Sequence, residues 1–149
     1  MKVAIDTTTL VYAEGVNGIQ KRIEARGLLD RLPDNSITLP VQVLGELFNV
    51  LVRKAGRTRS EARLAIIAWR KSYESIDTTS SMMLAAVDLA QNHVSIWDAV
   101  IVCAAAEAGC QLLLSEDMQD GFVWKGVTIA NPFAKNRHPL LEAALRPQP

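Results

Sequence analysis

Two acidic residues stand where a carboxylate could do chemistry, because each follows a short apolar run. Asp6 comes directly after residues 3–5, and Asp117 comes shortly after the segment 111–114. Each run predicts a buried strand that leads into a turn, so both acids are expected at the carboxyl ends of strands. In open parallel sheets, active sites form at this edge. Taken alone, Asp6 could cap the following helix, and Asp117 could be an ordinary turn residue.

Two further acids are expected on helices. Glu46 falls in a helix that opens at Pro40, on a different face from the apolar stripe of that helix. On its own it could be a solvated helix residue. Asp98 follows Ser95 at the spacing of a capping box, which on its own favours a capping role in the first helical turn.

These carboxylates would raise one another's pKa values if they met in one cleft, unless a cation neutralised them. Oxygen ligands with few histidines suit Mg²⁺ or Mn²⁺. Such a site can lower the pKa of a bound water and orient that water in line with a phosphodiester. The hypothesis is therefore a metal-dependent hydrolase whose catalytic and metal-binding residues are Asp6, Glu46, Asp98 and Asp117.

Short apolar strands alternate with amphipathic helices along the chain. The pattern predicts strands at 2–6, 36–39, 74–77, 111–114 and 127–130, and helices at 19–32, 40–55, 58–71, 80–92 and 95–108. Such alternation implies parallel pairing through right-handed crossovers. The expected fold class is α/β, a three-layer α/β/α sandwich with a mostly parallel sheet of about five strands. Residues 1–134 are expected to form one domain, and 135–149 a C-terminal tail that is poorly ordered or touches a partner.

Composition excludes several classes of function. The 16 Lys and Arg residues balance the 16 Asp and Glu residues, which argues against a high-affinity duplex binder but not against an enzyme that contacts phosphate briefly. The longest apolar run, residues 99–106, is far shorter than the roughly 20 residues that cross a bilayer, and Asp6 interrupts any signal peptide. A cytoplasmic protein without a membrane segment is expected. Cys103 and Cys110 lack zinc-site spacing and are expected to be buried and reduced.

Motifs of other enzyme classes are absent from the sequence. It contains no GxxxxGK[ST], no GxGxxG after a strand, no HExxH and no GxSxG. A haloacid-type phosphatase needs a second acid two positions after Asp6, where this chain has Thr8. His93 and His138 are isolated, and each is expected in a loop or at a helix end rather than as a catalytic base.

The ordered acidic motifs of the chain resemble those of a known family. From Val3 to Phe133 the sequence is similar to the PIN domains, and within them to the VapC-type ribonuclease toxins of bacterial and archaeal toxin–antitoxin pairs. The motifs that carry the resemblance are Val3-Ala-Ile-Asp6-Thr-Thr-Thr, Val43-Leu-Gly-Glu46-Leu, Trp97-Asp98-Ala99 and Ser115-Glu116-Asp117. The resemblance implies that these four acids bind metal and that Thr8 and Ser115 support them through hydrogen bonds. Asparagine is often found at the position of Thr8 and threonine at that of Ser115, but both replacements keep a polar oxygen.

The resemblance also implies partners. These are an RNA substrate, a second copy of the chain in a homodimer, and an antitoxin protein whose carboxyl-terminal segment would offer a basic side chain to the acids. The basic stretch could contact RNA phosphates or be a solvated face, and it comprises Arg53, Lys54, Arg57, Arg59 and Arg63. Asp120 could be an extra or substitute acid, although a loop residue is the simpler interpretation. Two alternatives stay open: a catalytically silent module that binds protein or RNA, and a metal-dependent nuclease that acts on DNA.

Overall fold

Six strands form one sheet at the centre of the molecule, in a computed structural model that describes residues 1–145. The strand order is β3-β2-β1-β4-β6-β5, and each neighbouring pair is parallel except β5 and β6. The strands are β1 (Val3–Ile5), β2 (Ile37–Pro40), β3 (Glu74–Ile76), β4 (Leu112–Leu114), β5 (Val123–Trp124) and β6 (Val127–Ala130). This confirms the predicted α/β sandwich with a mostly parallel sheet and adds one short strand to it.

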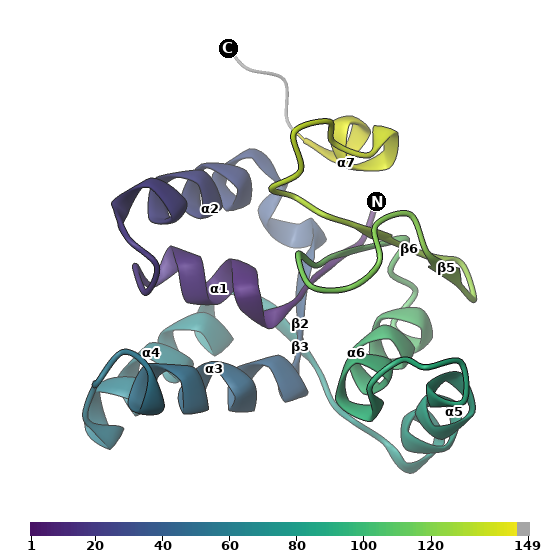
Figure 1. The fold of residues 1–149 in the computed structure, drawn as a ribbon, viewed down its shortest axis with the longest axis horizontal. Coiled ribbons are helices and arrows are strands. Elements are labelled where there is room, and N and C mark those ends of the chain that lie inside the picture. Colours follow the sequence, from purple (N-terminus) through teal and green to yellow (C-terminus); the bar gives the residue numbers. More distant parts are fainter. Residues whose placement is uncertain (146–149) are drawn as a thin grey trace.

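Helices connect the strands and pack in pairs around the sheet (Figure 1). α1 packs on α2, α3 on α4, and α5 on α6. The helices are α1 (Thr7–Ala13), α2 (Ile19–Arg31), α3 (Val41–Arg53), α4 (Arg59–Ser72), α5 (Ser80–Ala90), α6 (Ile96–Glu107) and α7 (Pro139–Ala144), with a 3₁₀ turn at Asp34–Ser36. None of the helices within residues 1–145 is long and apolar enough to cross a membrane.

The core is built on β1, β4 and α6. Every residue of β1 and β4 is buried, and so is the run 99–105 within α6. A helix that is apolar all round needs neighbours on every side, which explains why α6 lies against both α5 and the sheet. Cys103 and Cys110 are free thiols within this core, as the sequence predicted. The elements that carry Asp6, Asp98 and Ser115 are therefore held by packing.

The strand order creates a crevice beside β1. The chain passes from β1 to β2 on one side, whereas β4 lies on the other side of β1. Ligands of open α/β sheets bind at the carboxyl edge where the order reverses in this way. The two strand ends are joined there, because the Asp6 backbone N–H donates to the Leu114 carbonyl at 2.9 Å.

Three details differ from the sequence predictions. The tail is ordered over α7, where the Leu141 side chain is fully buried; residues 146–149 lie outside the described residues. In the amphipathic helix predicted at 19–32, the apolar side chains of Ile19 and Ile23 are not buried but 74% and 60% exposed. The inward stripe of α2 is instead Ala25, Leu28 and Leu29. The third difference is β5, which the sequence did not predict.

Candidate active site

Asp6 lies at the end of β1 with both carboxylate oxygens engaged. Oδ1 accepts from the Thr7 backbone N–H at 2.7 Å, and Oδ2 accepts from Ser115 Oγ at 2.6 Å. The residue is only 4% exposed. The pKa of Asp6 is raised to about 6, with burial as the main cause and smaller contributions from the negative charges of Asp98 and Glu46, against the lowering effect of the two hydrogen bonds. Asp6 thus caps α1 and also keeps a charge that the fold does not neutralise.

Asp98 occupies the first turn of α6, where Ser95 is the N-cap. Ser95 Oγ accepts from the Asp98 backbone N–H at 3.3 Å, so the predicted cap is present. The Asp98 carboxylate takes no part in a hydrogen bond among residues 1–145, and it is free to face the crevice. Burial raises the pKa of Asp98, as do the nearby negative charges of Glu46 and Asp117. Asp98 therefore interacts electrostatically with each of the other three predicted acids.

Hydroxyl groups of α1 hold the other two acids. Thr7 Oγ1 donates to Glu46 Oε2, and Thr8 Oγ1 donates to Asp117 Oδ2 at 2.8 Å. Gln42 Nε2 donates to the second Glu46 oxygen at 3.1 Å. Thr8 and Ser115 were expected to support the acids by hydrogen bonding, and each donates to one of them. The role of Thr7 was not predicted, although Thr7 belongs to the run of three threonines after Asp6.

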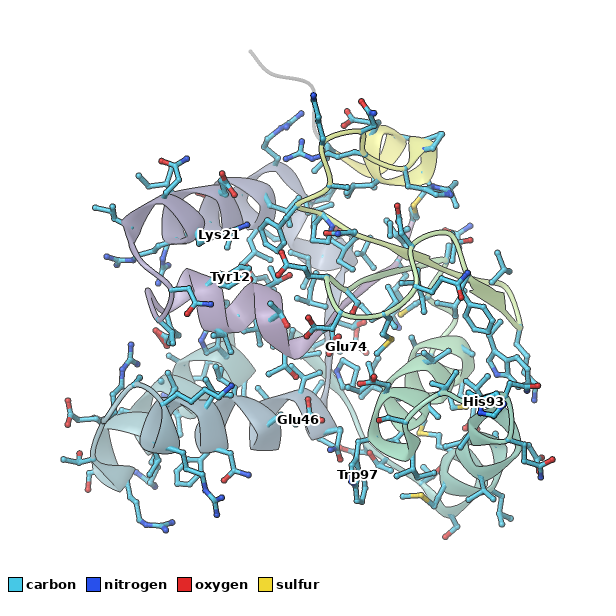
Figure 2. The ribbon with its side chains drawn as sticks, in the orientation of Figure 1. Tyr12, Lys21, Glu46, Glu74, His93 and Trp97 are labelled. Atoms are coloured by element: carbon cyan, nitrogen blue, oxygen red, sulfur yellow. The ribbon has the colours of Figure 1, made fainter. Side chains whose placement is uncertain are left out.

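Glu116 is also fixed, but it contacts groups other than the four acids. Tyr12 Oη donates to Glu116 Oε1, and Lys21 Nζ lies 3.8 Å from Glu116 Oε2. The Lys21 ammonium sits over the rings of Tyr12 and Phe133, at 5.2 and 5.0 Å from their centroids. Burial and this hydrogen bond raise the pKa of Tyr12 to about 12. Figure 2 shows Tyr12 and Lys21 on the neighbouring helices α1 and α2, with Glu46 on α3. This cluster anchors the loop that carries Asp117.

The donor set of the site suits a hard divalent cation. Its donor groups are carboxylates and hydroxyls, which match Mg²⁺ or Mn²⁺. No ion pair within residues 1–145 involves Asp6, Glu46, Asp98 or Asp117, although Lys and Arg pair with other acids of the chain. In the same part of the chain, no three His, Cys, Asp or Glu side chains are grouped tightly enough to hold a metal ion as they stand. Hydrogen bonds fix the carboxylates of Asp6, Glu46 and Asp117, and a cation would relieve the repulsion among the acids.

Two hollows meet at Asp117. One, of about 520 Å³, runs along α1 and is lined by Thr8, Glu46 and Lys54 among others. The other, of about 360 Å³, lies beside the start of α6, and Asp98 and His93 are among its lining residues. Both volumes are within the range of about 300–1,000 Å³ that is usual for ligand pockets. Asp117 thus lies between two hollows, of which the larger also reaches Glu46 and the smaller Asp98.

Other residues singled out in the sequence have different surroundings. Asp120 is exposed, and its Oδ1 accepts from the Asn131 backbone N–H at 2.9 Å, which is a loop-bracing role. Within the basic stretch, Arg57 pairs with Glu14 at 3.6 Å, while Lys54 lines the larger hollow. His138 is the N-cap of α7, a helix-end position as predicted.

Comparison with known proteins places the chain in a family. The family model of the PIN domain matches residues 3–119. The chain belongs to the PIN domain family. This confirms the family resemblance seen in the acidic motifs. A search of curated proteins gives no significant match.

Solved structures with the same fold include toxins of toxin–antitoxin pairs. A toxin–antitoxin complex from Klebsiella pneumoniae aligns with a TM-score of 0.65 at 18% identity, over 89% of this chain and 98% of the other. The VapC20 sarcin-ricin loop cleaving toxin of Mycobacterium tuberculosis aligns with a TM-score of 0.65 at 20% identity, over 78% of this chain and 92% of the other. VapBC2 from Rickettsia felis, bound to a promoter DNA fragment, aligns with a TM-score of 0.60 at 18% identity, over 78% of this chain and 89% of the other. At these identities the likeness concerns the fold, and this PIN domain has the fold of VapC-type toxins.

Proposed function

We propose that this PIN domain is a divalent-metal-dependent endoribonuclease that hydrolyses RNA phosphodiester bonds and is the toxin of a toxin–antitoxin pair. The observation that carries the proposal is the set of four acids at the carboxyl edge of β1 and β4. Burial and mutual repulsion raise the pKa values of Asp6 and Asp98, and no Lys or Arg within residues 1–145 pairs with the set. Carboxylates with raised pKa values and no basic partner are typical of a functional site.

Asp6, Glu46, Asp98 and Asp117 are the proposed ligands of Mg²⁺ or Mn²⁺. When bound, either ion supplies Lewis-acid chemistry that activates a water and stabilises the leaving oxygen of a phosphodiester. Thr8 and Ser115 orient Asp117 and Asp6 through their hydrogen bonds of 2.8 and 2.6 Å. Lys54, in the wall of the larger hollow, is placed to contact a phosphate of the RNA.

The proposed protein partners are an antitoxin and a second copy of the chain. The antitoxin proposal is supported by the structural neighbours, two of which are complexes of a toxin with its antitoxin. The homodimer proposal is supported by exposed apolar side chains. Trp97 is 52% exposed and points away from the body of the domain (Figure 2), and Phe48 lines an apolar hollow of about 460 Å³ between α3 and α4. The proposed location is the cytoplasm, where free thiols such as Cys103 and Cys110 stay reduced.

The test is cleavage of total RNA by the purified protein with Mg²⁺, Mn²⁺ or a chelator. Three proteins are compared: the wild type, Asp98→Asn, and Asp120→Asn as the matched control. Both substitutions exchange a carboxylate for an amide, but only Asp98 faces the other acids. We expect cuts at defined sites by the wild type and Asp120→Asn, only with metal, and a loss of at least about a hundredfold in rate for Asp98→Asn.

The outcomes separate the alternative functions. Equal activity of all three proteins under every metal would exclude these acids as an RNA-cutting centre. Cleavage of matched DNA but not of RNA would show that the protein is a metal-dependent nuclease that acts on DNA. No cleavage of either, with antitoxin or RNA binding retained by Asp98→Asn, would identify a catalytically silent binding module.

A further inference from the structure

The smaller hollow beside the acids has a chemical character of its own. It lies between the turn that precedes α6, α6 itself and the loop after β4, and it reaches inward to Asp98 and Asp117. Val102 and Ile129 are buried in its wall, and Phe122 adds an aromatic ring. The wall of this hollow therefore combines apolar and polar side chains, and the hollow borders the acids Asp98 and Asp117.

The rim of the hollow carries polar side chains. Asn92, His93 and Gln119 are exposed and line it, and among the described residues no Lys or Arg does. His93 has a φ of 64°, a left-handed conformation that is uncommon for residues other than glycine. Residues held in such conformations often lie at ligand-binding positions. Figure 2 shows His93 at the turn between α5 and α6, remote from Glu46.

The hollow on the other side of Asp117 differs in one respect. Its lining includes the cation Lys54 together with Asn17 and Asn49. Lys54 can contact a phosphate in the larger hollow, whose lining also carries Glu46 and Glu116, whereas the smaller hollow has no Lys or Arg and offers an apolar wall and amide groups. These are the features that bind the flat face and the polar edge of an unstacked nucleobase.

We propose that the hollow lined by His93, Gln119 and Phe122 binds the nucleobase next to the scissile phosphate and determines which base is preferred there. This deepens the proposed function and rests on it. The RNA is single-stranded at the cut, because a paired base cannot leave its helix to enter the hollow at low cost. The strand then continues past Asp117 into the larger hollow, where Lys54 contacts its backbone without regard to sequence.

The experiment is cleavage of a randomised single-stranded RNA library, sequenced after brief digestion by the wild type, Gln119→Ala, His93→Ala and Lys54→Ala. All three substituted residues are exposed, so thermal unfolding is expected to show intact folds. We expect the wild type to prefer certain bases at one nucleotide beside the cut. Gln119→Ala and His93→Ala should weaken that preference, at that nucleotide alone, by roughly five- to a hundredfold. Lys54→Ala should slow cleavage of every sequence alike and leave the preference unchanged.

A second measurement uses the preferred RNA with an abasic ribose at the same nucleotide. If the base occupies the hollow, removing the base and truncating Gln119 remove the same contact, so their effects on kcat/KM do not add. Additive effects, or an unchanged base preference in both Gln119→Ala and His93→Ala, would overturn the base pocket while the nuclease function stands. Absence of RNA cleavage by the wild type would instead remove the proposed function, and this inference with it.

Discussion

Replacing Asp6 by asparagine is expected to stabilise the metal-free protein at neutral pH while it abolishes activity. The pKa of Asp6 is raised from its ordinary value of 3.8 to about 6, with burial as the main cause. A difference of about two units, at about 1.4 kcal/mol each, means that the ionised carboxylate costs the fold about 3 kcal/mol.

The sign of the pH dependence follows from the raised pKa. Below about pH 4 the carboxyl group carries its proton in both the folded and the unfolded protein, so it contributes no difference. Between about pH 4 and 6 the unfolded chain releases this proton first, and the fold loses stability as pH rises. The asparagine side chain of the variant has no charge at any pH, so the variant avoids this loss.

A smaller opposing effect reduces the gain. The amide can still accept from the Thr7 N–H, but its NH₂ group faces Ser115 Oγ, which donates to Asp6 in the wild type. The exchange loses about 1 kcal/mol of hydrogen bonding. The expected gain in the free energy of unfolding is therefore about 2 kcal/mol above about pH 7, and in acid it should turn into a loss of about 1 kcal/mol, because only the hydrogen-bond effect remains there.

The assay is urea unfolding in the presence of a chelator, from acid to neutral pH. Asp120→Asn serves as the control, because it makes the same exchange at an exposed position. A difference between Asp6→Asn and wild type that stays constant across this pH range would refute the reasoning, since it would mean that Asp6 is not held in a charge-disfavouring site.

Three further outcomes are expected. Mg²⁺ or Mn²⁺ at about a hundredfold excess over Kd should raise the free energy of unfolding of the wild type by about 2.7 kcal/mol, and calorimetry should show no such gain in Asp98→Asn or Asp117→Asn. Tyr12→Phe removes the hydroxyl that donates to Glu116, so it should lower kcat more than it raises KM. It should also lower the free energy of unfolding in urea by about 1 kcal/mol. An unchanged kcat would show that the cluster of Tyr12, Lys21 and Glu116 does not position the site. Trp97→Glu should convert a dimer into a monomer in sedimentation without unfolding it, whereas a wild-type monomer would exclude the homodimer.

The sequence predicted the elements that local patterns specify. Apolar runs located all five parallel strands, and the acids after β1 and β4 were expected at strand ends because a strand must leave the core there. Ser95 was recognised as a helix cap from its spacing to Asp98. These features depend on neighbours in the chain, which a sequence displays directly.

Features that the sequence did not predict depend on backbone geometry or on distant contacts. β5 exists because Lys125 and Gly126 both adopt positive φ, 45° and 85°, and form the tight turn of a hairpin without the usual Asn-Gly pair. The tail was expected to be poorly ordered or to touch a partner, and the sequence did not predict α7, in whose first turn Pro139 stands, where proline is favoured. The bonds from Tyr12 to Glu116 and from Thr7 to Glu46 span 104 and 39 residues, so no local pattern could indicate them.

The hydroxyl partners explain how the fold fixes three of the four acids, Asp6, Glu46 and Asp117, at one sheet edge. Thr7, Thr8 and Ser115 each donate to one carboxylate, which fixes its position and compensates part of the cost of burial. A lysine or arginine in these places would also neutralise the charge, and it would then compete with a cation for the same oxygens. A hydroxyl leaves the negative charge in place, which is why the pKa of Asp6 stays raised despite two hydrogen bonds. The site is therefore ordered by neutral donors, and its charge remains available for a metal ion.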